Sequence, residues 1–266
     1  MTTGAELFQA GRLDDAVAAL NAQVRAKPGD VQSRLLLAQM LCFAGNQQRA
    51  DTLFDQIGTQ DPTLAPALAL SRQLLRADVA RTQFYEDGRL PEFLDSPPDW
   101  LQLSVKAAIA LRENDGASAV ALLAEAEGKR PAAAGTCDGR RFEDLRDMDD
   151  LAAGFFEVYT STGKYYWIPI DRVAEIEFRP PQQPRDLLWR QAHMSVVGGP
   201  EGEVYLPALY PLSNQAAEDP IRLGRATEWI EAEGAPVRGR GQRCFLVGEE
   251  SLPIMAATSL IFDRKE

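Results

Sequence analysis

Glycine, alanine, bulky apolar and proline residues recur at a fixed spacing of 34 positions in the first part of this chain. The matched pairs are Gly11 and Gly45, Ala16 and Ala50, Leu20 and Phe54, and Pro28 and Pro62. This spacing with these markers is typical of tetratricopeptide repeats, in which each unit is two antiparallel helices that bury their apolar faces by stacking on neighbours. The pattern therefore predicts stacked helical hairpins, with each glycine at a turn that needs a positive φ.

A further unit of the same kind follows after a break. Ala119, Leu123 and Pro131 repeat the last three markers, 69 positions after the second unit. The stretch from Leu64 to Arg81 keeps helical spacing but lacks the glycine and proline markers, so we expect a degenerate repeat there. Together these units predict a tetratricopeptide-like α-helical domain over residues 1–133.

The apolar spacing changes character beyond this domain. Regular helical spacing stops between Glu125 and Arg140, where alanine and glycine dominate, and we place a domain boundary there. One more helix is expected from Phe142 to Ala153, because acidic residues crowd its first turns as the helix dipole favours. The rest predicts a mostly antiparallel, β-rich domain over residues 140–266, so the expected fold class is α+β.

Alternating apolar positions and turn residues predict the strands of this second domain. The turn Ser161–Lys164 and the glycine-rich loop 198–202 each predict a hairpin. A short helix is expected around Arg225 to Ala232. The expected strands cover residues 156–160, 165–167, 172–178, 194–196, 204–206, 244–247 and 254–261. The alternation does not fix the order of the strands in the sheet.

Composition and charge narrow the classes of partner. The chain is 45% hydrophobic and 25% charged, which is ordinary for a soluble globular protein, and its formal net charge is −11. An acidic surface repels phosphate backbones and anionic lipid, which argues against nucleic acid or bare membrane as the main partner. Three cysteines, no run of 18 apolar residues and no leader-like N-terminus predict a cytoplasmic protein.

Candidate catalytic residues are few. His193 is the only histidine and no GxSxG motif is present, so we interpret Ser195 as its strand neighbour rather than a nucleophile. The favoured role of His193 is a strand or loop residue with a satisfied ring nitrogen. The alternative is an enzyme or small-ligand site within residues 140–266, where Arg185, Asp186 and His193 would converge on a pocket with a perturbed histidine pKa.

Metal and cofactor motifs are also lacking in the sequence. Zinc sites need four Cys or His ligands at short spacing, and the chain has no CxxC, HxxxH or phosphate-binding GxxxxGK[ST] motif. We interpret the carboxylates of residues 143–150 as a hydrated helix face rather than a cation site. The glycines and arginines of 238–241 indicate a solvated loop. No metal or cofactor is therefore expected.

Aromatic residues give the clearest candidates for partner contacts in the second domain. Tyr165, Tyr166 and Trp167 place rings on both faces of one strand. Tyr166 is either displayed at a protein interface or packed under an adjacent loop. Trp189 is either an anchor with a cationic rim or a core indole, and the core is the favoured interpretation.

Four segments follow one another in the second part of the chain: RRFEDLRDMDD from Arg140, TSTGKYYWIP from Thr160, IEFRPPQQPRDLLWR from Ile176 and EVYLPALYP from Glu203. In this order, behind a tetratricopeptide-like half, they resemble the ImpE family, also called SciE-type virulence protein or TagJ. The resemblance covers nearly the whole chain and is strongest over residues 140–211. The matching positions are Gly163, Tyr166, Trp167, Pro169, Asp186, Trp189, Pro207, Tyr210 and Pro211. Leu145 departs from the pattern, because many relatives carry tryptophan there.

The resemblance implies a cytoplasmic accessory protein of bacterial type VI secretion without enzymatic activity. Its implied partners are a TssB-like sheath subunit and the ClpV-type AAA+ ATPase that disassembles contracted sheath. A cytoplasmic adaptor with the same fold and an unrelated client is the remaining alternative.

The helical domain is the expected docking surface, because tetratricopeptide repeats line a concave groove with the first helix of each unit. We expect this groove to accept a short helix or peptide, with the β-rich domain as a second contact. Counting from the proline that ends each repeat places six residues on the groove: Gln32, Leu35, Gln39, Cys42, Gln73 and Arg76.

Overall fold

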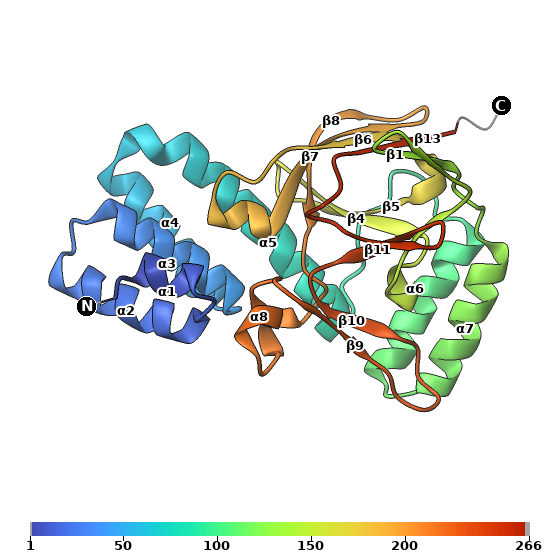
Figure 1. Ribbon diagram of the computed structural model, residues 1–266, viewed down its shortest axis with the longest axis horizontal. Coiled ribbons are helices and arrows are strands. Elements are labelled where there is room, and N and C mark those ends of the chain that lie inside the picture. Colours follow the sequence, from blue (N-terminus) through green and yellow to red (C-terminus); the bar gives the residue numbers. More distant parts are fainter. Residues whose placement is uncertain (1, 264–266) are drawn as a thin grey trace.

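The computed structural model describes residues 2–263 and has an α+β fold, as predicted (Figure 1). Its helices are α1 (Gly4–Gln9), α2 (Leu13–Ala26), α3 (Val31–Phe43), α4 (Gln47–Gln60), α5 (Ala65–Asp87), α6 (Asp99–Arg112), α7 (Gly116–Lys129) and α8 (Asp219–Arg222). Short 3-10 turns are η1 (Pro62–Leu64), η2 (Asp150–Ala152), η3 (Ile170–Arg172), η4 (Pro184–Leu187) and η5 (Ser213–Gln215). The helices α1–α4 form one end of the molecule, and we call them, with the first half of α5, the helical lobe.

The predicted helical hairpins are confirmed. Helices α1 and α2, α3 and α4, and α6 and α7 pack as successive pairs. Gly11 and Gly45 turn two of these pairs with φ values of 77° and 73°, the left-handed conformation that glycine adopts without a Cβ clash. The small repeat residues Ala16, Ala50 and Ala119 have no exposed surface, which lets the paired helices approach closely.

The helical spacing expected over residues 64–81 is confirmed, but the expected degenerate repeat is not a hairpin. Residues 64–81 do not form a helix pair; η1 leads directly into α5, a single helix of 23 residues that ends at Gly88 with a φ of 83°. No glycine or proline interrupts the chain between Leu68 and Phe84, so nothing in this stretch favours a turn. Helix α5 therefore extends from the helical lobe to the sheet region, and Figure 1 shows it crossing between the two ends of the molecule.

The predicted antiparallel strands form one large sheet and two small ones. The large sheet has the order β2-β1-β13-β6-β7-β8-β4-β5, and the small sheets are β12-β11-β3 and β10-β9. The β4–β5 and β7–β8 hairpins are confirmed. The strands are β1 (Gly135–Cys137), β2 (Arg140–Phe142), β3 (Leu145–Asp147), β4 (Phe155–Thr160), β5 (Tyr165–Pro169), β6 (Val173–Phe178), β7 (Trp189–Val196), β8 (Glu201–Pro207), β9 (Thr227–Ile230), β10 (Arg238–Gly241), β11 (Cys244–Val247), β12 (Glu250–Pro253) and β13 (Ser259–Phe262).

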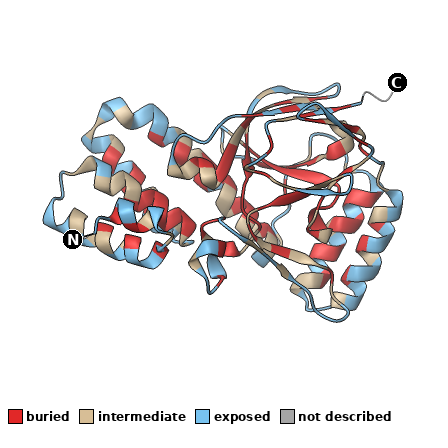
Figure 2. Cartoon of the chain, viewed as in Figure 1, coloured by how far each residue is buried: buried red, intermediate tan, exposed pale blue. Residues whose placement is uncertain are grey.

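Both faces of strand β4 are buried, each against a different core. Phe155 and Tyr159 belong to a core shared with the helices, whereas Phe156 and Val158 belong to a second core enclosed by the sheets. The first core is continuous from the helical lobe to the aromatic residues of the sheet, and Figure 2 shows buried residues on both sides of that junction. The helices and the sheet thus exclude water together.

Two expected helices are wrong. Residues 142–153 contain strand β3 and turn η2 instead of a helix, because Leu145 and Asp147 are buried on one side of an extended segment that pairs with β11. Residues 225–232 contain strand β9, and the short helix of this region is α8.

Two other segments also differ from expectation. The segment 238–241, expected as a solvated loop, is strand β10 and pairs with β9. Its glycines allow close packing, because a Cβ at Gly239 would stand 2.3 Å from the Tyr210 ring. The strand expected at 254–261 begins only at Ser259, after a turn.

Helices α6 and α7 lie beside the sheets (Figure 1). The Trp100 indole covers Gly154, where a Cβ would stand 2.7 Å from the ring. Arg130, at the end of α7, forms an ion pair of 2.6 Å with Asp144. The boundary expected between a helical domain (residues 1–133) and a β-rich domain (residues 140–266) stays a prediction.

Helix α8 and the residues after it fasten the sheet region to the first helical hairpin. The N-cap residue of α2, Arg12, makes no side-chain capping bond; instead Asp219 accepts a hydrogen bond of 2.7 Å from the Leu13 amide. At the neighbouring end of α1, Arg225 donates to the carbonyls of Phe8 and Gln9. A carboxylate at a helix N-terminus and a guanidinium at a helix C-terminus both complement the helix dipole.

We expect Asp219→Ala to destabilise the α1–α2 hairpin by about 1 kcal/mol, because the first turn of α2 loses its capping acceptor. Hydrogen exchange of the α1 and α2 amides measures this loss directly. Asp14→Ala is the matched control: it removes the other carboxylate partner of Arg222, and its side chain is 76% exposed. Equal exchange in the two variants would contradict a capping role for Asp219.

Candidate functional site

The most unusual feature of the junction between helices and sheet is a carboxylate with no exposure to water. Glu157 on β4 is held by Arg81 on α5, whose Nε and Nη2 lie 2.9 and 2.7 Å from its two oxygens. Arg243 donates to the same carboxylate from the opposite side. Tyr85 and Tyr165 also donate their hydroxyls to it. Five hydrogen bonds therefore reach the two carboxylate oxygens, as a buried charge requires.

The network continues from Arg243 into the sheets. Arg243 forms a second ion pair of 3.0 Å with Asp147, and Tyr210 donates to that carboxylate at 2.9 Å. Asp149 accepts hydrogen bonds of 2.9 Å from Arg238. We call this set the ionic cluster; it contains three guanidiniums and three carboxylates, so its formal charges balance: Arg81, Asp147, Asp149, Glu157, Arg238 and Arg243.

The sequence positions these groups through strand alternation. Glu157 shares its face of β4 with Phe155 and Tyr159, which all point toward α5. The nearby ring of Trp167 stacks on Phe155 at 3.9 Å between centroids, and its indole donates to the Tyr165 hydroxyl at 2.6 Å. Aromatic packing thus fixes the hydroxyl that in turn donates to the carboxylate.

The environment shifts the pKa values of Glu157 and Asp147 in opposite directions. Burial acts to raise the pKa of Glu157, but the charges of Arg81 and Arg243 outweigh it and lower that pKa from 4.5 to about 2. Burial raises the pKa of Asp147 to about 7, against the attraction of Arg243 and with the repulsion of Asp149. Glu157 is therefore the fixed anion of the ionic cluster.

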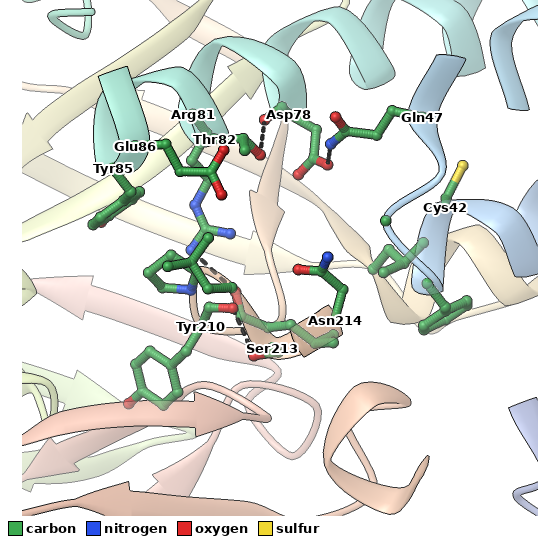
Figure 3. Close-up of a pocket in the computed structure, with 16 residues that line it drawn as sticks. Cys42, Gln47, Asp78, Arg81, Thr82, Tyr85, Glu86, Tyr210, Ser213 and Asn214 are labelled. Atoms are coloured by element: carbon green, nitrogen blue, oxygen red, sulfur yellow. Dashed lines mark hydrogen bonds between the residues drawn. The ribbon is translucent and has the colours of Figure 1, made fainter. Parts of the chain in front are cut away.

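A small hollow of about 90 Å³ lies next to the ionic cluster, between α3, α5 and the loop after β8. Figure 3 shows its polar lining, in which Gln47 donates to Asp78 at 2.7 Å. Tyr159 donates to the other oxygen of Asp78. Cys42 lies at the wall, where burial raises the pKa of its thiol and keeps it protonated. Several of the polar groups that line the hollow are thus already hydrogen-bonded within the protein.

The expected docking groove of the helical lobe is largely occupied by the chain itself. Turn η4 packs against α3, and Arg185 donates to the Ser71 hydroxyl at 2.7 Å and to the Ala67 carbonyl at 3.2 Å. Gln39 and Cys42 are consequently only 5% and 8% exposed. Their prediction as accessible contact residues is wrong, because the β6–β7 connection fills the groove.

The other predicted groove residues remain accessible to different degrees. Gln32 is exposed and Leu35 is half-buried on α3. On α5, Gln73 is half-buried and Arg76 exposed, and both lie at the β4–β5 turn. The turn approaches so closely that a Cβ at Gly163 would stand 2.5 Å from the Gln73 side-chain oxygen.

The two aromatic candidates have different surroundings. Tyr166 is half-buried, packs against the second core and has the Lys164 ammonium 5.9 Å from its ring centre. Trp189 is 2% exposed and belongs to the core shared with the helices, which confirms the core interpretation. Its prediction as an exposed partner-binding residue is therefore wrong, because the core covers its indole ring.

The residues of the rival enzymatic site are bonded to separate partners. His193 lies on β7, where its ring contacts Glu201 at 3.1 Å and Glu203 at 3.6 Å, and these carboxylates raise its pKa. Asp186 accepts from the backbone amides of residues 182 and 183 and so closes turn η4. Arg185 reaches Asp186 at 3.6 Å but otherwise binds α5.

Over residues 2–263, no group of three or more His, Cys, Asp or Glu side chains is placed to hold a metal ion. None of the described helices combines the length and apolar character needed to cross a bilayer.

The α5–α6 connection forms one wall of a mainly apolar concavity. This groove has a volume of about 320 Å³, and we call it the apolar groove. Glu92 fixes the connection to the edge of β5, because its amide donates to the Tyr165 carbonyl at 2.8 Å and its carbonyl accepts from the Trp167 amide at 3.1 Å. The main lining residues of the apolar groove are Phe93, Leu94, Pro97, Trp100, Pro131 and Pro169.

The rim of the apolar groove is acidic and its wall includes an exposed leucine. Leu94 is 36% exposed, and Leu90 on the same connection is 60% exposed. Asp95 forms an ion pair of 3.1 Å with Arg172, and Asp171 also lines the groove. Exposed apolar residues that gather at a hollow with a polar rim are typical of protein-interaction sites.

Sequence reasoning missed the ionic cluster and the apolar groove. One signal was available: Glu157 interrupts an otherwise apolar and aromatic strand, FFEVYT, at a position that must face a core. The partners of Glu157 could not be found in this way, because Arg81 and Arg243 lie 76 and 86 positions away.

Known proteins resemble this chain along nearly its whole length. Residues 139–261 match the family model described as ImpE protein. The type VI secretion system accessory component TagJ of Pseudomonas aeruginosa is 31% identical over 98% of this chain and 89% of its own length. The crystal structure of protein VPA1032 from Vibrio parahaemolyticus has a TM-score of 0.92 at 26% identity, covering 98% of both chains.

We expect Glu157→Gln to destabilise the protein by about 3–5 kcal/mol at pH 7, because two buried guanidiniums lose their shared anion. The folded-state pKa of Glu157 is lowered, so its contribution is full above pH 4.5 and is lost as the pH falls toward 2. The stability difference between wild type and variant should therefore shrink over that interval. Urea unfolding at several pH values measures it.

Glu92→Gln provides the control for this prediction. Glu92 pairs with Lys164 at 3.0 Å, but both side chains are about half exposed. Its substitution should change stability by less than about 1 kcal/mol. A Glu157→Gln effect that is the same at pH 3 and pH 7 would show that the carboxylate charge is not what stabilises the junction.

Proposed function

This chain belongs to the ImpE family of type VI secretion accessory proteins, and from that premise we propose that it is a non-enzymatic adaptor that binds a TssB-like sheath subunit, a ClpV-type ATPase or both. The proposal concerns the partners and the absence of catalysis. Its accessory role in secretion follows from the family itself.

The apolar groove is the observation that carries the proposal. It is an open concavity of about 320 Å³ whose lining includes Leu94, a large apolar residue left 36% exposed. Covering the exposed third of this side chain in an interface stabilises a complex by about 0.5–1 kcal/mol. The surrounding prolines and the backbone bonds of Glu92 hold the groove in shape, so little ordering is needed on binding.

The acidic rim defines the kind of segment that fits this groove. Asp95, Asp171 and Arg172 line it, and Asp99 begins the adjacent helix α6. Arg172 offsets only one of these carboxylates. A partner segment with an apolar residue flanked by lysine or arginine would therefore bury its side chain and gain attraction at the rim.

The helical lobe supplies a second contact in this proposal. Turn η4 covers the middle of its groove, but Gln32 and Leu35 on α3 and Arg76 on α5 retain accessible surface. Gln73, which lies against the β4–β5 turn, would contribute at the margin. Tyr166 lies next to Glu92 on β5, but its ring packs against the second core, on the face opposite the groove-lining Trp167, so its contact with a partner stays a prediction.

The cysteine and histidine side chains, which are the usual nucleophiles and bases, are buried or paired within the protein, and this supports a binding role. Burial raises the pKa values of all three cysteine thiols, and His193 is engaged by two carboxylates. The ionic cluster is closed by its own ion pairs and serves the junction between helices and sheet. We therefore assign function to surfaces rather than to a reacting centre.

We expect Leu94→Asp to weaken binding of the purified TssB-like or ClpV-type partner at least about tenfold, because it places a charge where an apolar side chain docks. Isothermal titration with each partner measures the loss and identifies which one binds directly. Val197→Asp is the matched control, since Val197 is 45% exposed at the β7–β8 turn.

A paired variant tests the helical lobe separately. Gln32→Glu combined with Arg76→Glu should weaken the same complex by a smaller factor if that lobe is the second contact. Full affinity in both this variant and Leu94→Asp would sink the proposed binding mode. Failure of the wild-type chain to bind either partner would sink the proposed function itself.

A further inference from the structure

A third surface hollow lies between the end of α5, the last turn of α6 and the β9–β10 ribbon. It has a volume of about 230 Å³, and we call it the arginine hollow. Its lining combines guanidiniums with an aromatic ring and aliphatic side chains, in contrast to the apolar groove. The residues that matter for its chemistry are Tyr85, Leu111, Arg112, Ile230, Arg238 and Arg240.

Three arginines converge here although the chain carries a net charge of −11. Arg238 is committed to Asp149 in the ionic cluster. Arg240 reaches Glu228 at 3.3 Å, and these side chains are 32% and 46% exposed, so that pair is weak and exchangeable. Arg112 donates to the Phe84 carbonyl at 3.0 Å, and no ion pair with a carboxylate is formed by it within residues 2–263.

Apolar surface accompanies these charges. Ile230 is 40% exposed on β9, and Leu111 and Leu212 lie on the facing walls. The pairing register places Ile230 opposite Arg238, so the aliphatic and charged positions belong to neighbouring strands of one ribbon. A ligand that satisfies the hollow must therefore carry both a carboxylate and an apolar side chain.

We propose that the arginine hollow binds an acidic, leucine-bearing segment of a protein partner. Arg112 and Arg240 would receive a glutamate or aspartate side chain through the fork of N–H donors that guanidinium offers to carboxylates. The apolar side chain would pack on Ile230 and Leu111. This inference rests on the proposed adaptor function and adds a second class of segment, opposite in charge to the one that the apolar groove selects.

The walls of the arginine hollow are held by the ionic cluster. The Arg238 guanidinium lies 5.8 Å from the centre of the Tyr85 ring, and the Tyr85 hydroxyl donates to Glu157. Two hydrogen bonds that Arg238 donates to Asp149 also fix the position of its guanidinium. The hollow is therefore formed before any ligand binds, which reduces the ordering that binding requires.

Fluorescence anisotropy with the full-length protein tests the proposal. The probe is a short fluorescein-labelled peptide of alternating glutamate and leucine residues, and its counterpart has lysine in place of glutamate. We expect saturable binding of the first peptide only. Arg240→Glu and Ile230→Asp should each weaken it at least about tenfold, since each removes one of the two recognised features.

Arg140→Glu is the control for charge alone. It makes the same change in net charge at β2, where the Arg140 side chain is 83% exposed. Arg112 is left intact because its bond to Phe84 supports the end of α5. Circular dichroism of each variant verifies that the helices remain folded, and Arg240→Ala, which carries no new charge, should give an intermediate loss.

Three results would overturn the inference: no binding of the acidic peptide, an equal loss in Arg140→Glu, or complete displacement of the peptide by millimolar inorganic phosphate. The last would identify a simple anion site rather than a peptide site. These results concern only the arginine hollow. The proposed function is tested separately, by titrating the Leu94→Asp variant with the secretion partners.

Discussion

The carboxylate of Glu157 is the point at which helices and sheet depend on each other. A charge without access to water is stable only when donors surround it, and its donors come from both regions of the chain: Arg81 from α5 and Arg243 from the segment before β11. Apolar packing alone would permit several arrangements of helix on sheet. The fixed positions of two guanidiniums around one anion favour a single arrangement.

At this junction the tetratricopeptide-like repeats have a different role from those of an open repeat array. In an open array the concave side is free for a partner, but here the β6–β7 connection lies on it and Arg185 is bonded to α5. The repeats therefore serve first as a support for the sheet region. Recognition is left to hollows at the periphery, one apolar with an acidic rim and the other rich in arginine.

Local patterns predicted those parts of the fold that local interactions determine. Gly11 and Gly45 marked helix turns because their backbone conformation is intrinsic to glycine, and alternation marked the hairpins of the large sheet. The acidic segment after residue 142 was misread because helix-dipole arguments consider only near neighbours. Asp147 is instead paired with Arg243, 96 positions away, and no periodicity could reveal that pairing or the cluster and hollows built around it.

The capping of α2 by Asp219 has a consequence for the order of events during synthesis. The two residues are 206 positions apart, and ribosomes add roughly 5–20 residues per second, so the amide of Leu13 waits on the order of 10–40 s for its acceptor. The first hairpin leaves the ribosome without the acceptor for its Leu13 amide, and one of the last segments to emerge supplies it. A nascent chain stalled before α8 would thus expose an uncapped helix end to chaperones.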